Sequence, residues 1–383
     1  MVQKFVLESS ETLYNALKPL LFRLTAGEAH ARVLRLLALA DSSALACALL
    51  RWVYRVAFAP HPRPSPEFGG VHVGGVTLDH PLILAAGFVK GQGFTSEAQA
   101  LAAVERGEDI IPGWRSMPAL VGLVEFGSFT RYPRMGNPGV VMWRDPATRS
   151  IQNRVGLKNP GARAAAAFLA RHKRHLPRTF GINIAVSPGV SDPAQEETEI
   201  REAIRLFLDM GIVPSWFTLN LSCPNTEDDP GANQTEASAR RLCAAAISEL
   251  NGRTPLWVKL SPGLADEQYA ALLLAAVETG VQAIIATNTL AQPTPDNPLV
   301  LGGVAGGRLY ASACEAVTSL LRAKLHERYK IDVIACGGIA DGRSWASFGA
   351  TAGQYYSALI YRGALAAAII EREYEQFSRV DTR

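Results

Sequence analysis

Residues 256–288 read LWVKLSPGLADEQYAALLLAAVETGVQAIIATN, and the pattern of this stretch decides the fold. It opens with a short apolar segment, Leu256–Leu260, and closes with another, Ala283–Asn288. The alanine- and leucine-rich stretch between them, Tyr269–Val277, is typical of a helix, whereas short apolar runs of this kind are typical of buried strands. Strands that alternate with helices predict parallel pairing. The stretch therefore predicts one strand–helix–strand unit.

The same alternation extends in both directions along the chain. Short apolar segments, rich in residues that favour strands, recur at Leu82–Gly87, Leu123–Gly127, Thr179–Ile184, Trp216–Ser222, Leu256–Leu260, Ala283–Asn288, Asp332–Gly337 and Gln354–Ile360. Alanine-rich stretches such as Ala162–His172 and Ala237–Leu250 separate most of them. Eight apolar strands without an obvious edge strand favour a closed (β/α)8 TIM barrel. An open doubly wound sheet is the alternative, but no GxGxxG motif follows the first strand.

Residues 1–60 are expected to form a helical extension, and residues 67–383 the barrel domain. Leucines recur at helical spacing between Leu13 and Leu24, and Thr25 with Glu28 has the spacing of a capping box. A second apolar run, from residue 33 to 58, carries Arg35, Arg51, Trp52, Tyr54 and Arg55. This mixture suits a surface that lies on lipid headgroups at the cytoplasmic face of a membrane, although a helical pair packed on its own domain fits equally well.

The composition excludes several classes of protein. The chain has 38 Lys and Arg against 35 Asp and Glu, so it lacks the basic surplus of a nucleic-acid binder. Five widely spaced cysteines without a CxxC pair argue against a disulfide framework. No HExxH motif is present, and we therefore expect no metal site.

Polar residues gather where the strands end, which is where barrel enzymes carry their active sites. The amides Asn183, Asn220, Asn225 and Asn288 lie in or after strands, and Asn153 lies in an expected loop. Carboxamides both donate and accept hydrogen bonds, so such a set suits a heterocycle with N–H and C=O groups. Lys259 lies inside an apolar strand, where a bound anion would offset the cost of burying its charge.

Glycines near the last two strands predict a phosphate site. The segments are Gly302–Gly307, Gly337–Gly338 and Tyr356–Ser357, and barrel phosphate sites form in this region. Cys223 precedes Pro224 at the end of the fourth strand, with amides on both sides. Its thiol can act as a general base once positive charge nearby lowers its pKa.

The most specific motif is Asn220-Leu221-Ser222-Cys223-Pro224-Asn225, and this motif resembles the dihydroorotate dehydrogenases. Supporting motifs extend the resemblance over nearly the whole chain: Ala85-Ala86-Gly87 with Lys90, Asn153-Arg154-Val155-Gly156, Gly181-Ile182-Asn183, Val258-Lys259, Thr287-Asn288-Thr289, Gly302-Gly303 with Gly306, and Gly337-Gly338. The segment from Leu17 to His30 resembles the helical extension of the membrane-associated, quinone-using branch.

The resemblance implies FMN-dependent oxidation of dihydroorotate to orotate in pyrimidine biosynthesis, with a quinone as acceptor. Cys223 would remove the C5 proton, with Lys90 beside it. The residues expected to bind the pyrimidine are Lys90, Asn153, Asn220, Asn225, Asn288 and Thr289. Those expected to bind FMN are Ala86, Gly87, Ser128, Asn183, Asn220, Lys259, Thr287, Gly306, Gly338, Tyr356 and Ser357.

The chain departs from the family pattern at several positions. Cys223 is the base of the soluble branch, whereas the quinone branch carries serine. Val89 replaces an acidic residue, and residues 139–143 lack the arginines usual near the quinone tunnel. Two alternatives therefore stay open: an FMN enzyme that acts on another dihydropyrimidine-like ring, and a non-catalytic barrel that binds a phosphate ligand.

Overall fold

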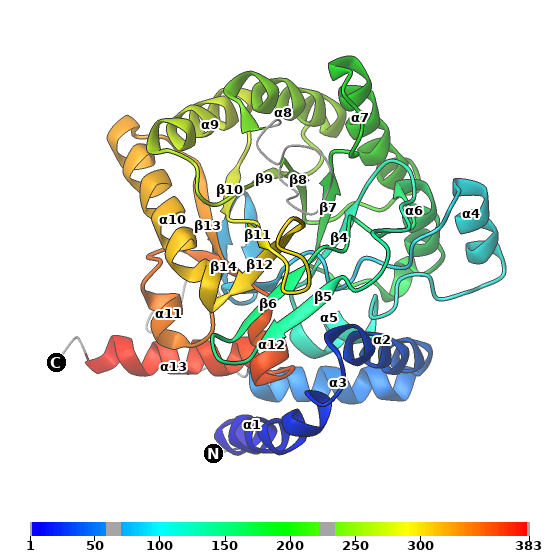
Figure 1. The fold of residues 1–383 in the computed structure, drawn as a ribbon, viewed down its shortest axis with the longest axis vertical. Coiled ribbons are helices and arrows are strands. Elements are labelled where there is room, and N and C mark those ends of the chain that lie inside the picture. Colours follow the sequence, from blue (N-terminus) through cyan, green and yellow to red (C-terminus); the bar gives the residue numbers. More distant parts are fainter. Residues whose placement is uncertain (1, 59–69, 222–233, 381–383) are drawn as a thin grey trace.

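The computed structural model describes residues 2–58, 70–221 and 234–380, and its centre is a closed barrel of eight parallel strands (Figure 1). Around the barrel the strands are β3 (Leu82–Leu84), β4 (Glu125–Phe129), β7 (Gly181–Ala185), β8 (Trp216–Asn220), β9 (Leu256–Leu260), β10 (Ala283–Ala286), β13 (Asp332–Cys336) and β14 (Ala352–Tyr355). A bridge between Leu84 and Val124 joins β3 to β4 and closes the ring. The predicted TIM barrel is confirmed.

Helices surround this barrel as the alternating pattern predicted. They are α4 (Glu97–Glu105), α5 (Ser116–Val121), α6 (Ala162–Arg171), α7 (Pro193–Asp209), α8 (Glu236–Leu250), α9 (Asp266–Thr279), α10 (Gly307–Glu327), α11 (Gly342–Ala346), α12 (Ser357–Arg362) and α13 (Ala366–Val380), with a 3-10 turn η1 (Lys173–His175) after α6. Alanine dominates the buried face of α6, where Ala162, Ala165 and Ala166 are inaccessible to solvent. Small side chains let this helix lie close to the strands.

One predicted strand is wrong over most of its length. The last strand was expected at Gln354–Ile360, but β14 ends at Tyr355 and Ser357 begins the helix α12. A short apolar run fits a strand and a buried helix equally well, so its residues alone do not separate the two.

A second sheet lies at the C-terminal end of the barrel. It is formed by two pairs of strands, each inserted in the chain after a barrel strand. It contains β5 (Met142–Asp145) and β6 (Ser150–Asn153), inserted after β4, and β11 (Leu290–Pro293) and β12 (Leu301–Gly306), inserted after β10. The four strands are antiparallel in the order β11-β12-β6-β5. The sequence patterns did not predict this sheet.

The opposite, N-terminal end of the barrel is closed by a hairpin around Gly74 and Gly75. Its strands are β1 (Val71–Val73) and β2 (Val76–Leu78). Above the hairpin the rings of Trp216 and Trp257 stack with centroids 4.4 Å apart, and Trp257 Nε1 donates to the carbonyl of Gly74 at 2.9 Å. These groups form an apolar floor to the barrel.

Three helices form the N-terminal segment: α1 (Val2–Leu21), α2 (Ala26–Ser42) and α3 (Ala44–Ala57). In Figure 1 they lie together on the side of the barrel that carries α5, α12 and α13. The capping box of Thr25 and Glu28 is present, but the run expected from residue 33 to 58 is broken at Ser43, which caps α3 through its side chain. The boundary expected between residues 60 and 67 lies outside the described residues, and the division into two domains stays a prediction.

Two carboxyl groups join these helices to the segment 108–119. Asp41 is almost fully buried and accepts hydrogen bonds from the backbone N–H groups of Gly113, Arg115 and Ser116, at 2.6, 3.1 and 2.6 Å. It thereby satisfies N–H groups at the start of α5 that have no partner within that helix. Burial raises the pKa of Asp109 to about 7, and the negative charge of Asp41 and the hydrogen bond between the two carboxyl groups act in the same direction.

We expect this pair to make stability depend on pH in an unusual direction. A carboxyl pKa that is raised on folding stabilises the native state at low pH, and the contribution is lost as the pH rises from about 4 to about 7. Asp109→Asn mimics the protonated form, because its amide can donate to Asp41. It should raise the free energy of unfolding by about 1–2 kcal/mol at pH 8 and have little effect at pH 4.

Urea denaturation of both proteins at pH 4, 6 and 8 measures the difference. Asp296→Asn, at an exposed position in the β11–β12 connection, is the control and should change stability at none of them. An Asp109→Asn protein as stable as the parent at pH 8 would contradict the raised pKa of the Asp109 carboxyl.

Candidate active site

The barrel interior holds a carboxylate that is inaccessible to solvent, Glu125. Its Oε1 accepts a hydrogen bond from Asn183 Nδ2 at 2.9 Å. Its Oε2 accepts three more, from Trp216 Nε1 at 2.9 Å, Thr218 Oγ1 at 2.7 Å and Gln354 Nε2 at 3.0 Å. A buried charge is tolerated only when it is hydrogen-bonded in this way. Glu125 therefore fixes the side chains of β7, β8 and β14 around one point.

Lys259 belongs to the same cluster. It is 5% exposed, and its Nζ donates to Gln354 Oε1 at 2.9 Å. Gln354 thus lies between the ammonium group and the Glu125 carboxylate, bonded to both. An ammonium group carries three donors, and Gln354 accepts from one of them. Burial raises the pKa of the neighbouring Cys336 thiol, although the charge of Lys259 acts in the opposite direction.

The strand-end amides meet beside this cluster. Asn220, the last residue of β8, donates from Nδ2 to Ser128 Oγ at 3.5 Å and accepts at Oδ1 from Asn288 Nδ2 at 3.3 Å. Asn288 Oδ1 accepts from the backbone N–H of Thr289 at 2.8 Å. Asn220 also pairs in register with Lys259 on the adjacent strand. The structure therefore brings together residues from four predicted segments.

The turn after β3 lies against the start of α12. Gly87 donates its N–H to the carbonyl of Gly127 at 2.7 Å, next to Ser128. Gly87 has a φ of +114°, and a side chain there would meet Tyr356 Cε2 at 3.5 Å. Ala86 precedes it in the same turn, and Phe88 contacts the Tyr356 ring edge-on. Burial raises the pKa of Tyr356 to about 12, so its hydroxyl stays protonated.

Two of the predicted glycine segments are neighbours in space. Gly306 has a φ of +90° and is the N-cap of α10, a helix of 21 residues. A Cβ on Gly338 would lie 2.6 Å from Tyr310 Cβ and 3.0 Å from the Gly306 carbonyl oxygen, so only glycine fits here. Thr287 joins the same region, because its N–H donates to the carbonyl of Cys336 at 2.6 Å.

Other expectations need correction. Gly302 and Gly303 do not form a phosphate turn, because both lie within strand β12 and pair with β11, and Gly303 also pairs with β6. Asn153 is not in a loop; it is the last residue of β6, and its Nδ2 donates to the Gly303 carbonyl at 3.5 Å. The insertions after β4 and β10 pair with each other through β6 and β12. Because of this pairing, Asn153, Gly302 and Gly303 lie in strands instead of loops.

The two most specific residues of the motif, Cys223 and Asn225, lie outside the described residues. Their roles stay predictions. Among the described residues, no cluster of three or more His, Cys, Asp or Glu side chains is placed to hold a metal ion.

Sequence reasoning missed two residues of this region. Glu125 lies in an apolar run, Val124-Glu125-Phe126, and a charge in such a run is the same signal that identified Lys259. His30 of α2 lies edge-on to Phe88, with ring centroids 5.8 Å apart. Burial, together with the charges of Lys90 and Lys158, lowers the pKa of His30 to about 4, so this histidine is neutral at pH 7. Only the fold brings α2 to Lys90, and no sequence signal predicts that contact.

Comparison with known proteins agrees with this arrangement. The family model described as dihydroorotate dehydrogenase matches residues 70–377. Similar proteins named "Dihydroorotate dehydrogenase (quinone)" occur in Leifsonia xyli, at 34% identity over 81% of this chain and 85% of the relative, and in Chloroflexus aurantiacus, at 30% identity over 97% and 99%.

Solved structures show the same fold. A ligand-free DHODH from Eimeria tenella has a TM-score of 0.68 at 26% identity and covers 88% of this chain and 95% of its own. The Eimeria tenella DHODH in complex with ferulenol has a TM-score of 0.67 at 25% identity, covering 89% and 92%. With its eight-stranded barrel and its cluster of strand-end amides around Lys259, the chain belongs to the dihydroorotate dehydrogenase family.

Proposed function

We propose that this protein uses FMN to oxidise dihydroorotate to orotate and passes the electrons to a quinone. The observation that carries the proposal is the contact of Asn220 with Ser128 and Asn288, directly beside the buried Lys259. This group offers amide donors and acceptors and one cation at the end of a barrel where active sites lie. The names of the relatives supply the substrate and the acceptor.

The described residues fit a flavin mononucleotide. Asn183 Oδ1 and Thr289 Oγ1 are buried polar atoms without a hydrogen-bond partner among the described residues. Such atoms are costly unless a ligand or water satisfies them, and a heterocycle with N–H and C=O groups does so. For the phosphate, Gly306 is the N-cap of α10, and backbone N–H groups at the start of a helix are a favourable site for an anion.

The residues that would hold FMN are those that the family pattern assigns. Ala86, Gly87, Ser128, Asn183, Asn220, Thr287 and Lys259 would contact its ring system, and Gly306, Gly338, Tyr356 and Ser357 its phosphate end. When bound, FMN supplies the two-electron acceptor for the hydride that leaves C6 of dihydroorotate.

The chain itself binds the pyrimidine and moves the proton. Asn153, Asn220, Asn225, Asn288 and Thr289 would hold the ring and its carboxylate through amide and hydroxyl groups, with Lys90 beside them. The Cys223 thiolate would take the proton from C5 as the C5–C6 double bond forms. The positive charge of Lys90 would favour the thiolate over the thiol.

The family match also decides between the alternatives. The matched region, residues 70–377, spans the whole barrel, and the amides named above are retained within it. This favours dihydroorotate over another dihydropyrimidine-like ring, and an enzyme over a non-catalytic barrel.

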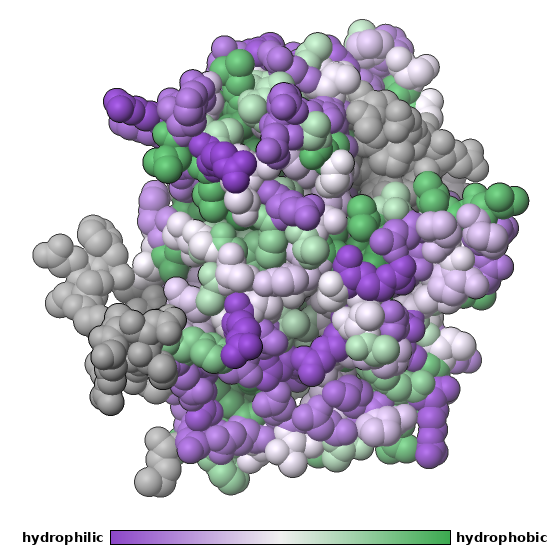
Figure 2. Space-filling view, turned by 60° about the vertical axis from the view of Figure 1, so that its left-hand side comes forward, coloured by the Kyte–Doolittle hydropathy of each residue, from purple (hydrophilic) through white to green (hydrophobic). Residues whose placement is uncertain are grey.

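Exposed apolar side chains support a peripheral contact with the cytoplasmic face of a membrane, from which a quinone would enter. The three N-terminal helices expose large hydrophobic residues: Val2, Phe5, Leu13, Leu17, Leu20, Leu36, Leu39, Leu45, Leu49 and Trp52. In contrast, polar and apolar residues are interspersed over the side that lies on the left in Figure 1 and is turned forward in Figure 2. Tyr54, expected at the lipid surface, instead packs on Phe58 and His80.

Among the described residues, no single helix is long and apolar enough to cross a bilayer. Only α2 and α3 taken together have that length and composition, and the pair is bent by 105°.

We predict that Lys259→Met weakens FMN binding by at least about 10-fold, because a charge-assisted contact is lost in a buried site. Titration of the apoprotein with FMN, followed by flavin fluorescence, measures the change. Lys330→Met, at an exposed position, is the control and should bind FMN like the parent. Unchanged affinity in the Lys259 variant would remove this residue from the cofactor site.

For the base, we predict that Cys223→Ala retains FMN and binds orotate but reduces its flavin on the order of 100-fold more slowly, the usual effect of removing a general base. Anaerobic stopped-flow mixing with dihydroorotate records the bleaching of the flavin. Cys314→Ala, in the helix α10, should react at the parent rate. A Cys223→Ala protein with the parent rate would assign the proton to another group.

For the membrane contact, we predict that Leu45→Gln with Leu49→Gln abolishes most binding to vesicles of phosphatidylcholine and phosphatidylglycerol, because apolar area enters the lipid. Vesicle co-sedimentation measures the bound fraction. Leu299→Gln with Leu325→Gln changes residues that are 91% and 80% exposed elsewhere and should leave binding intact. Equal loss in both double variants would contradict a contact through α3.

A further inference from the structure

The short helix α12 connects the proposed phosphate end of the site to the N-terminal helix α1. Its first residue, Ser357, follows Tyr356 at the start of the helix, and its last residue is Arg362. The helix has only six residues, so its two ends are rigidly related. Any contact that fixes Arg362 also fixes the position of Ser357.

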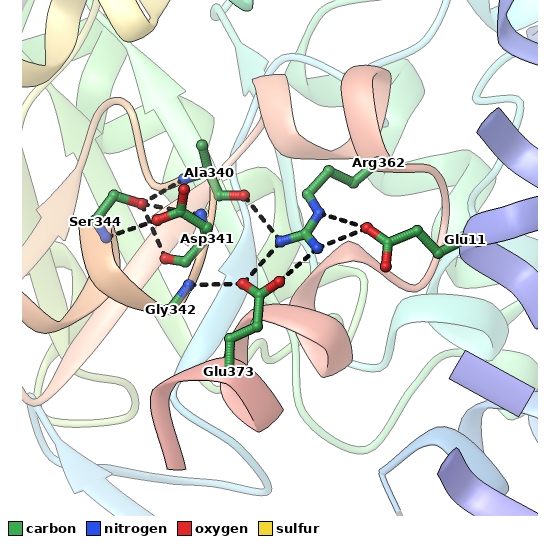
Figure 3. Close-up of polar contacts among 7 residues, drawn as sticks. All are labelled: Glu11, Ala340, Asp341, Gly342, Ser344, Arg362 and Glu373. Carbon is green, nitrogen blue, oxygen red and sulfur yellow. Dashed lines mark hydrogen bonds and ion pairs between the residues drawn. The ribbon is translucent and has the colours of Figure 1, made fainter. Parts of the chain in front are cut away.

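Arg362 is held by two carboxylates from distant parts of the chain (Figure 3). Its Nε and Nη2 donate to Glu11 Oε1 of α1 at 3.1 and 2.6 Å. Its Nη1 and Nη2 donate to the two oxygens of Glu373 in α13, at 2.9 and 2.6 Å. Burial alone would lower the pKa of Arg362, but the hydrogen bonds with Glu373 and Glu11 outweigh it and raise that pKa.

The same cluster holds the loop that follows Gly338. Arg362 Nη1 also donates to the carbonyl of Ala340 at 3.2 Å, and Glu373 Oε2 accepts from the N–H of Gly342 at 2.8 Å (Figure 3). Both segments assigned to the phosphate, the Gly338 loop and the start of α12, are therefore tied to one arginine.

Two further bonds join α1 to the C-terminal end of α12. Tyr14 Oη donates to the carbonyl of Ile360 at 2.6 Å, and Lys18 Nζ donates to that of Tyr361 at 3.2 Å. Carbonyl groups in the last turn of a helix lack partners within the helix, and a lysine there is favourable. Lys18, Tyr361 and the three charged residues of the arginine cluster line a cavity of about 480 Å³ between α1 and the barrel. The ion pairs and hydrogen bonds bridge α1 to α12 at the edge of this cavity, beside the edge-on contact of Phe22 with Tyr361.

We propose that Glu11, Arg362 and Glu373 form a positioning cluster through which docking of α1 stabilises the phosphate end of the FMN site. This proposal rests on the FMN function proposed above. Arg362 acts through α12 and the Gly338 loop, so it is a positioning residue. Because coupling between two sites is reciprocal, seating of α1 and binding of FMN favour each other.

Glu11→Gln tests the proposal, since it retains the shape of the side chain and loses its charge. Glu8→Gln is the matched control: Glu8 also lies on α1 and pairs with Arg372 of α13, at 3.5 Å, and within the described ranges neither residue has a hydrogen bond or ion pair with α12. Holoenzyme is diluted, and the rise in flavin fluorescence gives the rate of FMN release. We expect release to be about five-fold faster or more in Glu11→Gln and unchanged in Glu8→Gln.

A second readout reports on the phosphate itself. The ³¹P NMR signal of bound FMN should shift in Glu11→Gln, while the visible flavin spectrum stays that of the parent. Arg362→Lys, which keeps the charge but lacks the planar fork of donors that contacts Glu11, Glu373 and the Ala340 carbonyl together, should behave like Glu11→Gln. Thermal melting of each variant verifies that it is folded.

The outcomes separate the two proposals. Parent-like release and an unshifted ³¹P signal in Glu11→Gln would overturn the positioning cluster, as would equal acceleration in Glu8→Gln. A parent protein that retains no FMN would instead overturn the proposed function.

Discussion

The buried carboxylate of Glu125 is the constraint on which the barrel interior depends. Removing a carboxylate from water is costly, and here four donors from three strands offset that cost. Each donor is thereby held in one orientation. Asn183 keeps its Oδ1 atom available for the proposed cofactor, and Trp216 is held in the floor of the barrel. Gln354 directs its carbonyl oxygen toward Lys259. The orientation of the lysine and of the amide that face the proposed cofactor thus follows from a residue that touches neither substrate nor solvent.

Most of the barrel could be predicted, because each of its strands is buried on both faces and therefore reads as an apolar run. The last strand was predicted too far along the chain because the apolar residues after Tyr355 carry the same signal: Ala358 and Tyr361 are buried in the helix α12, and Leu359 and Ile360 are partly buried. The second sheet was missed for the opposite reason. Its strands β5 and β11 are only partly buried and mix polar with apolar residues, as in Met142–Asp145 and Leu290–Pro293, so no period of two is visible.

In the site, a residue could be identified from the sequence only where its chemical type differs from that of its neighbours or where it lies in a specific motif. Lys259 was found because a charge interrupts an apolar strand, and Cys223 because it lies within a specific motif. Glu125 gave the same signal as Lys259 but is the first residue of β4, whereas functional residues were sought toward the C-terminal ends of the strands. Arg362 gave no signal, since its partner Glu11 lies 351 positions away and only the fold brings them together.

The stacked tryptophans and the hairpin beneath them also determine from which end of the barrel reactants can enter. Val73, Val76 and Leu78 pack under Trp216 and Trp257, so one end of the barrel is sealed by apolar side chains. Reductant, oxidant and products must all arrive at and depart from the other end. Two reactants that use the same entrance compete for it. This competition is avoided if one of them enters from the side, between the rim of the barrel and the N-terminal helices. His30 contacts Phe88 where α2 borders that rim. A second entrance at this point would let the oxidant reach the site without displacing the reductant.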